Sequence, residues 1–256
     1  MKPTDCEDIL GFPVTTRTRE ECIDQICDWI RSNEKGRYFV CANPHSLEIA
    51  RTDRLFTKAV LAADMVTPDG VGMLVASRML GGRIQERITG SGIFRELSRV
   101  LDRNGKYRYF FLGSTEENLA RLQDKVQKRF SNIEIVGTHS PPFKNEFSDD
   151  ESQIMIDAVN NAQPDVLWVG MTQPKQEKWI YQHKDKLNVS FIGAVGAVFD
   201  FYVGTVKRDY PWFLSHGLEW LPRLIQEPRR LWNRMFVSAP LFLMRVLLQR
   251  LRRGKR

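Results

Sequence analysis

The chain has 256 residues, of which 42% are hydrophobic and 27% are charged, and its formal net charge is +7. These proportions are those of an ordinary globular protein, and the length allows a sizeable core. No low-complexity tract is present, no apolar N-terminal signal is visible, and no run approaches the ~20 apolar residues that a membrane-spanning helix needs.

All four cysteines lie within the first 41 residues, at Cys6, Cys22, Cys27 and Cys41. None has the CxxC spacing of a structural zinc site, and a secreted disulfide framework would need a shorter, cysteine-rich chain. We therefore expect free thiols in a reducing compartment.

The positive charge is concentrated near the C-terminus. Residues 207–256 hold 12 Lys and Arg against three acidic residues, a balance of +9, whereas residues 1–206 hold 26 basic and 28 acidic residues, a balance of −2. Such a segment favours an anionic partner, either nucleic acid or a membrane surface.

Strand and helix patterns alternate along the first 200 residues. The expected helices cover 17–32, the segment after Pro44, 55–61, the segment after Gly70, 92–103, 116–129, 152–161 and 175–183. The expected strands cover 38–42, the segment ending at Asp69, 107–112, 133–136, 165–169 and 189–192. This alternation predicts an α/β fold with a doubly wound, mostly parallel sheet. Beyond about residue 205 the helical segments are broken by prolines, so we predict a core over 1–204 and a helical, basic appendage over 205–256.

The most informative strand end reads Thr67-Pro68-Asp69-Gly70. Pro68 and a positive φ at Gly70 predict a tight turn, which would leave Asp69 facing the crevice where open α/β sheets bind ligands. The carboxylate could instead only cap the following helix. Both interpretations fit the residues.

A second strand end reads Gly170-Met-Thr-Gln-Pro174-Lys175-Gln176-Glu177. Pro174 is expected at the first helical position, and the unpaired N–H groups of that turn favour an anion. Lys175 would add a full positive charge there, although it could also be a solvated surface residue.

Two further strand ends carry weaker signals. Asn43 can bond a ligand or close its own turn, and Gly113 with Ser114 and Thr115 forms a glycine turn into a helix, with capping-box spacing from Ser114 to Glu117. The four histidines (His45, His139, His183 and His216) are scattered without evident partners, and no Asp-x-Asp occurs, so no metal site is predicted.

Taken together, these motifs resemble the WecG/TagA/CpsF glycosyltransferases. The resemblance rests on seven segments in the family's order: Asn43-Pro44, Thr67–Gly70, Arg87–Ser91, Phe111–Gly113, Val169–Glu177, Val195–Asp200 and Glu219–Arg223. It implies a Rossmann-like fold and an inverting transfer, without a metal or other cofactor, of a hexosyl or N-acetylhexosaminyl group. The donor would be a UDP-sugar, and the acceptor a sugar linked to polyprenyl diphosphate, in cell-surface polysaccharide or teichoic-acid-type biosynthesis.

The resemblance also implies roles for individual residues. Asp69 corresponds to the catalytic base, and Asn43, Arg87, Gly113, Lys175 and Gln176 fall in substrate-binding segments. Arg223 and Arg230 correspond to appendage arginines that close over the diphosphate. Three positions depart from the family's usual residues: Cys41, Gly92 and the segment Arg208–Pro211. These departures affect which sugar is expected more than which type of reaction.

The C-terminal segment 236–256 combines an apolar stripe with arginines. Leu241, Met244, Leu248 and Leu251 line one face of a helix, with Arg245 on another. This pattern is typical of a helix lying on an anionic membrane surface, and the alternative is a helix packed on the body or in a homo-oligomer interface. A peripheral location on the cytoplasmic face of the membrane would follow from the first interpretation.

Two other function classes need consideration. A non-catalytic sugar-nucleotide-binding protein would keep Lys175 and Gln176 but tolerate loss of Asp69. A nucleic-acid-binding protein is disfavoured, because the basic residues alternate with Leu and Phe and no known nucleic-acid-binding motif is present.

Overall fold

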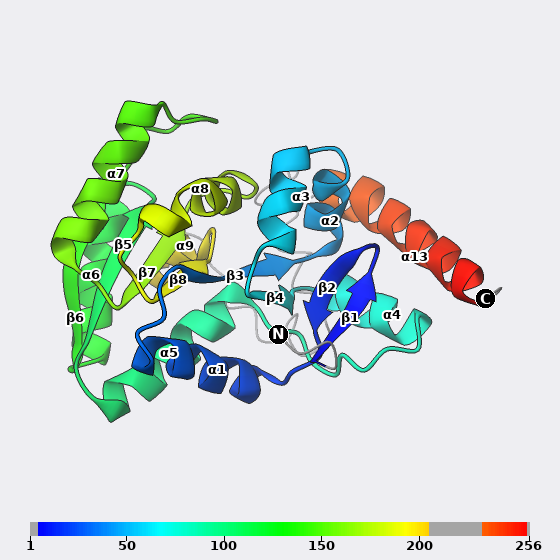
Figure 1. Cartoon of the computed structure of the whole chain (residues 1–256), viewed down its shortest axis with the longest axis horizontal. Coiled ribbons are helices and arrows are strands. Elements are labelled where there is room, and N and C mark those ends of the chain that lie inside the picture. Colours follow the sequence, from blue (N-terminus) through cyan, green and yellow to red (C-terminus); the bar gives the residue numbers. More distant parts are fainter. Residues whose placement is uncertain (1–4, 205–231, 255–256) are drawn as a thin grey trace.

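The computed structural model describes residues 5–204 and 232–254. Its centre is a parallel sheet of six strands in the order β4-β3-β8-β7-β5-β6 (Figure 1). The strands are β3 (Arg37–Ala42), β4 (Met65–Pro68), β5 (Tyr107–Gly113), β6 (Ile133–His139), β7 (Val166–Gly170) and β8 (Phe191–Ala194). Parallel pairing requires crossover connections, and helices provide most of them here.

Two helical layers cover the sheet. One face packs against α2 (Pro44–Ala50), α3 (Arg54–Leu61), α4 (Val71–Met79), α7 (Asp149–Ala162), α8 (Lys175–His183) and α13 (Ala239–Arg253). The other packs against α1 (Arg19–Arg31), α5 (Gly90–Asn104), α6 (Glu116–Arg129) and α9 (Val198–Val203). Tyr38 and Val40 of β3 contribute to the first core, and Phe39 between them contributes to the second, as the two-residue period of a strand requires. The predicted doubly wound α/β fold is therefore confirmed.

Local signals explain several helix starts. Thr18 caps α1 in a capping box with Glu21, and Ser148 caps α7 in the same way with Glu151. Gly70 has φ +94°, as the turn after Pro68 predicted. Pro174, however, is the residue before α8 and not its first helical residue.

The sequence pattern missed some elements. The chain begins with a hairpin of β1 (Cys6–Ile9) and β2 (Phe12–Thr15), which the pattern left unassigned. The capping box predicted for Ser114 and Glu117 is wrong, because Thr115 caps α6 by accepting from the Asn118 N–H. Ser114 instead has φ +60° and turns its hydroxyl toward Asp200.

The described part of the appendage is helical and lies against the body. It consists of η3 (Asn233–Ser238) and α13, and α13 inserts Phe242 and Val246, both fully buried, into the core beside α2 and α4. A boundary at residue 205 remains a prediction, since residues 205–231 lie outside the described ranges.

Candidate functional site

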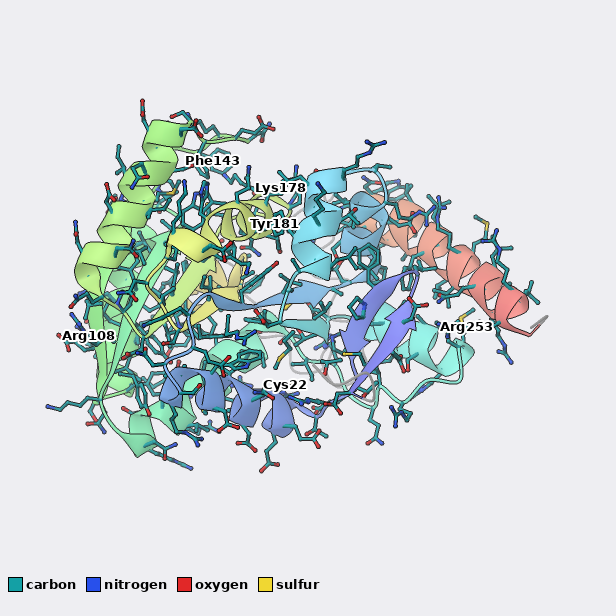
Figure 2. The ribbon with its side chains drawn as sticks, in the orientation of Figure 1. Cys22, Arg108, Phe143, Lys178, Tyr181 and Arg253 are labelled. Carbon is teal, nitrogen blue, oxygen red and sulfur yellow. The ribbon has the colours of Figure 1, made fainter. Side chains whose placement is uncertain are left out.

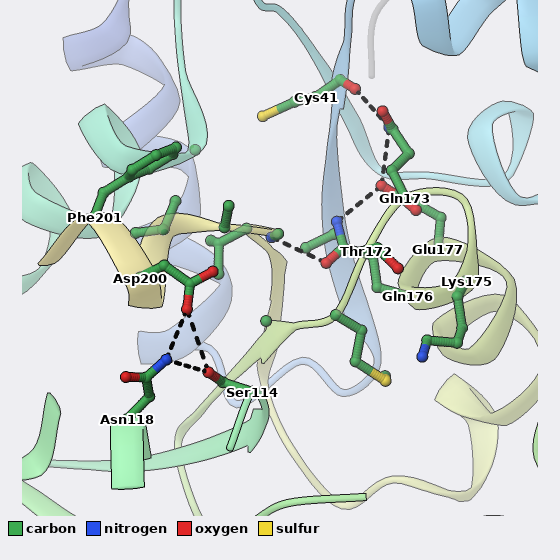
Figure 3. Close-up of a pocket in the computed structure, with 18 of the residues that line it drawn as sticks. Cys41, Ser114, Asn118, Thr172, Gln173, Lys175, Gln176, Glu177, Asp200 and Phe201 are labelled. Atoms are coloured by element: carbon green, nitrogen blue, oxygen red, sulfur yellow. Dashed lines mark hydrogen bonds between the residues drawn. The ribbon is translucent and has the colours of Figure 1, made fainter. Parts of the chain in front are cut away.

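A pocket of about 510 Å³ opens where the parallel strands end. Every strand of the six-stranded sheet contributes to its lining with its last residues or with the loop that follows: Cys41 of β3 and Asn43 after it, Asp69 after β4, Ser114 after β5, Ser140 after β6, Gly170 of β7 and Ala194 of β8. This is the carboxyl edge at which open α/β sheets bind ligands. Figure 3 shows part of this lining.

Asp69 lies in this pocket, as predicted. Its backbone N–H donates to the Ala42 carbonyl at 2.7 Å, which ties the ends of β3 and β4 together. The N-cap residue of α4 is Gly70, so a role as N-cap does not explain Asp69. Burial, followed by the negative charge of Asp69, raises the pKa of Cys41, so the thiol beside this carboxylate stays protonated.

Asn43 lies next to Asp69 in the lining and also has a local structural role. Its Oδ1 accepts from the Ser46 N–H at 2.9 Å, while the Ser46 hydroxyl accepts from the Asn43 N–H at 2.8 Å. This capping box starts α2. The turn-closing interpretation of Asn43 is therefore confirmed, with its side-chain oxygen held by the cap, and ligand binding by Asn43 stays a prediction.

Glu177 is the hub of a buried hydrogen-bond network at the start of α8. Its Oε1 accepts from the Gln173 and Gln176 side-chain amides, each at 3.0 Å (Figure 3). Gln173 also donates to the Cys41 carbonyl at 3.3 Å, and the Gln176 Oε1 accepts from the Gly196 N–H at 2.9 Å. One carboxyl group thus joins the ends of β3, β7 and β8.

The second oxygen of Glu177 is buried without a hydrogen-bond partner among the described residues. Burial raises the pKa of Glu177 to about 7, against the smaller opposing effect of the bonds from Gln176, its own backbone and Gln173. The sequence motif Val169–Glu177 contains this residue, but the pattern predicts no role for it. The only sequence feature that pointed to a role for Glu177 in the site is its position next to Gln176.

Lys175 and Gln176 both line the pocket, but they differ in how they are held. Gln176 is buried and engaged with Gly196 and Glu177. The Lys175 ammonium donates to the Lys144 carbonyl at 2.7 Å and lies 5.1 Å from the Phe147 ring centroid. Partial burial lowers the pKa of Lys175. Lys175 is therefore tied to the loop before α7 and is not a fully solvated surface charge.

The other end of the pocket carries a polar cluster that the sequence reading did not identify. Asp200 accepts from the Asn118 side-chain amide at 2.9 Å and from the Ser114 hydroxyl at 3.4 Å (Figure 3). Phe201, the next residue after Asp200, also lines the pocket, whereas the exposed Phe143 lines it beside Lys175, whose ammonium lies 5.5 Å from the Phe143 ring centroid. An aromatic ring beside carboxylate and hydroxyl groups can contact the base and ribose of a nucleotide.

The remaining predicted site residues are placed differently. Arg87 is not among the residues lining the pocket, and its carbonyl accepts from Arg19 at 3.4 Å. Gly113 is buried below the lining, where a Cβ would lie 2.5 Å from the Gly170 carbonyl oxygen. Its role in the structure is close packing of β5 against β7. Arg223 and Arg230 lie outside the described residues.

One appendage arginine does reach the pocket. Arg234 of η3 lines it together with Lys175, so two cationic side chains share a cavity with the Asp69 carboxylate. A general base and cationic groups are what a transfer with an anionic leaving group requires. Across residues 5–204 and 232–254, His, Cys, Asp and Glu side chains form no group of three or more that could hold a metal ion.

Comparison with known proteins places this site in context. The model of the family described as "Glycosyl transferase WecG/TagA/CpsF family" matches residues 7–256. Similar curated proteins carry the name N-acetylglucosaminyldiphosphoundecaprenol N-acetyl-beta-D-mannosaminyltransferase. One from Bacillus spizizenii is 30% identical over 83% of this chain and 79% of its own length. One from Bacillus subtilis is 28% identical over 94% of this chain and 91% of its own, and one from Staphylococcus aureus is 26% identical over 93% and 91%.

Proposed function

Because the chain belongs to the WecG/TagA/CpsF glycosyltransferase family, we propose that it moves a hexosyl or N-acetylhexosaminyl group from a UDP-sugar to a sugar linked to polyprenyl diphosphate. The observation that carries this proposal is the placement of the Asp69 carboxylate in one pocket with Lys175 and Arg234. The names of the relatives favour N-acetylmannosamine as the group transferred and diphosphate-linked N-acetylglucosamine as the acceptor.

In the proposed reaction the Asp69 carboxylate takes the proton from an acceptor hydroxyl. At the same time the oxygen of that hydroxyl attacks the anomeric carbon of the donor. The bond from that carbon to the UDP oxygen breaks, and UDP leaves with the electron pair. Because one displacement occurs, the anomeric configuration inverts. A base positioned at the reacting hydroxyl contributes about 10²–10⁴-fold to the rate of such a step.

Charge on the departing diphosphate would be stabilised by protein cations, in a transfer that needs no metal. Lys175 and the first turn of α8 face the pocket from one side, and Arg234 reaches it from the appendage. Fixed cationic groups and helix N-termini lower the energy of a developing anion because they need no reorganisation. Arg223 and Arg230 would add to this stabilisation.

The acceptor's lipid implies a membrane partner, and α13 offers the surface for it. Leu241, Met244, Leu247, Leu248 and Leu251 are exposed along this helix, each between 38% and 56%. Its other face carries the buried Phe242 and Val246. Within the described ranges no helix is both long and apolar enough to cross a bilayer. We therefore propose peripheral docking on the cytoplasmic face through the exposed row.

The direct test is a UDP-release assay with a panel of UDP-sugars, each with and without a short-chain lipid-diphosphate N-acetylglucosamine. The proposal predicts release that depends on one donor and on the acceptor together. Tight UDP-sugar binding without turnover for any acceptor would contradict it and favour a non-catalytic binding protein.

A further inference from the structure

A second hollow, of about 460 Å³, lies away from the candidate active site. It is bounded by the turn of the N-terminal hairpin, the end of α2 and the C-terminal half of α13. Its lining comprises Asp8, Leu10, Gly11, Arg51, Arg245, Leu248, Gln249, Arg252 and Arg253. We call it the arginine groove. Figure 2 labels Arg253 at the end of α13, on the opposite side of the molecule from Arg108.

The groove carries unbalanced positive charge. Of its four arginines, Arg253 donates to Asp8 Oδ2 at 2.8 Å, and Arg245 pairs with Glu48 at 3.1 Å. Arg51 and Arg252 have no ion pair with any residue in the described part of the chain, and both are exposed. Two guanidinium groups facing one hollow favour an anion, and their planar donors suit the oxygens of a phosphate.

The walls of the groove are held together by partly buried and exposed hydrogen bonds. Gln249 accepts from the Leu10 N–H at 2.9 Å and donates to Asp8 Oδ2 at 2.7 Å. Arg253 also donates to the Asp8 carbonyl at 3.0 Å. The hairpin turn and α13, which are more than 230 positions apart in the sequence, are therefore fixed to each other by side-chain contacts. These hydrogen bonds fix the shape of the groove and do not involve Arg51 or Arg252.

The surroundings of the groove indicate which anion it receives. Leu248 both lines the groove and belongs to the exposed apolar row of α13, so the arginines of the groove adjoin an apolar surface. A free phosphate would make no use of that row. A phospholipid offers both parts, with its phosphate at the depth of the arginines and its acyl chains beside the leucines.

We propose that the arginine groove binds the phosphate of an anionic phospholipid headgroup. The inference rests on the membrane docking in the proposed function and adds to it a site to which both the core and the appendage contribute. Arg51 belongs to the end of α2 and Asp8 to the hairpin, so the groove would fix how the core sits on the membrane, with the active-site pocket held at one orientation to a lipid-linked acceptor.

The test compares vesicle co-sedimentation of the full chain on phosphatidylcholine alone and on mixtures in which about one lipid in three is phosphatidylglycerol. Near a membrane surface each basic residue is worth about 1 kcal/mol. The variant Arg51→Ala/Arg252→Ala should therefore lose roughly tenfold or more in affinity for the anionic vesicles. Its binding to pure phosphatidylcholine should match that of the unmodified chain.

The matched control is Arg103→Ala/Lys106→Ala, which removes two exposed cations at the end of α5, far from α13 (Figure 1). It should stay within about twofold of the unmodified chain on both kinds of vesicle, because its charges lie far from the docking surface and are screened by salt. Equal losses in the two double variants would overturn the groove as a site. Calorimetry with inorganic phosphate adds a further arm, and saturable binding there without any vesicle effect would also overturn the lipid assignment.

The outcomes separate this inference from the function on which it rests. If the unmodified chain fails to bind any vesicle, the proposed docking and the groove both fail. If it binds anionic vesicles and the Arg51→Ala/Arg252→Ala variant binds equally well, only the groove fails. Glycosyl transfer measured with a detergent-soluble acceptor should be the same in all three proteins, because neither pair of residues lines the active-site pocket.

Discussion

Gln176 donates its side-chain amide to Glu177 Oε1 at 3.0 Å, and this bond determines which end of the Gln176 amide faces Gly196. With its nitrogen held by Glu177, the Gln176 oxygen accepts from the Gly196 N–H. The loop after β8 is thereby fixed against the start of α8. The shape of the pocket therefore depends on the carboxyl group of Glu177, a residue that is only 1% exposed.

Glu177 should make the stability of the fold depend on pH. Its pKa is raised by burial to about 7, whereas glutamate in an unfolded chain has a pKa of about 4.3. Between these values the folded state holds a proton that the unfolded state has released. The protonated Glu177 carboxyl therefore stabilises the folded state in full below about pH 4.3. As pH rises to 7, the free energy of unfolding falls by roughly 3 kcal/mol on account of this group.

Urea unfolding at a series of pH values would measure this loss. Glu177→Gln keeps the shape and the acceptor oxygen but cannot ionise, so its stability relative to the unmodified chain should increase between pH 4.5 and 7. The nearby Cys41 and Tyr38 do not titrate between pH 4.5 and 7, because burial raises the pKa of each further above this range. Parallel pH curves for the two proteins would show that Glu177 is ionised or neutral throughout.

Lys175 and Gln176 should respond differently to substitution. Lys175→Ala removes a cation that lines the pocket but leaves the Glu177 network intact, so UDP affinity should fall by about tenfold or more, the size of a lost charge-assisted bond. Gln176→Ala breaks the contact with Gly196, so it should reduce stability by about 1–2 kcal/mol as well as activity. Calorimetry with UDP and urea unfolding separate the two effects, and unchanged UDP affinity in Lys175→Ala would remove Lys175 from the donor site.

Gly113 tests whether the close approach of β5 and β7 is essential to the pocket. Alanine there combines φ +116° with a Cβ 2.5 Å from a backbone oxygen, so it should cost about 3 kcal/mol or more. Gly81→Ala is the matched control, because Gly81 has φ +71° with nothing within 4 Å of the added carbon. It should cost about 1 kcal/mol. Equal losses by urea unfolding would mean that backbone conformation alone matters.

The two faces of α13 should separate folding from membrane docking. Replacing the exposed Leu241, Met244 and Leu251 with serine should abolish vesicle binding with little change in stability, because these side chains leave few contacts behind. Phe242→Ala should do the reverse and cost about 3–5 kcal/mol, since the ring is fully buried. Removing all of residues 236–256 would mix both effects. Retained vesicle binding in the serine variant would contradict docking through this row.

The sequence predicted the sheet well because its signals are local. Apolar strands such as 38–42 and the turn at Pro68–Gly70 depend on neighbouring residues, and both were placed correctly. The hairpin at Cys6–Thr15 was not predicted, because its strands are only four residues long and its apolar residues pack against distant segments. Which residue caps α6 also depended on a contact between residues far apart in the sequence, since the Ser114 hydroxyl donates to Asp200.

The site was predictable only where a motif marks a strand end. Asp69, Asn43, Lys175 and Gln176 line the pocket because each follows a parallel strand. Glu177, Asp200 and Arg234 could not be assigned from the pattern, because burial, a bond to Asn118 and the fold of the appendage bring them there. Arg87 shows the converse, since a residue within a matching motif need not face the pocket.

The central claim is that Asp69 is the general base of a glycosyl transfer, and the most direct measurement is the turnover of Asp69→Asn. With the donor and acceptor found by the UDP-release assay, turnover should fall by about 10²–10⁴-fold while donor affinity changes little. Glu116→Gln, a second carboxylate of the same lining, should stay within a few-fold of the unmodified chain. Near-normal turnover in Asp69→Asn, or an equal loss in Glu116→Gln, would contradict the assignment.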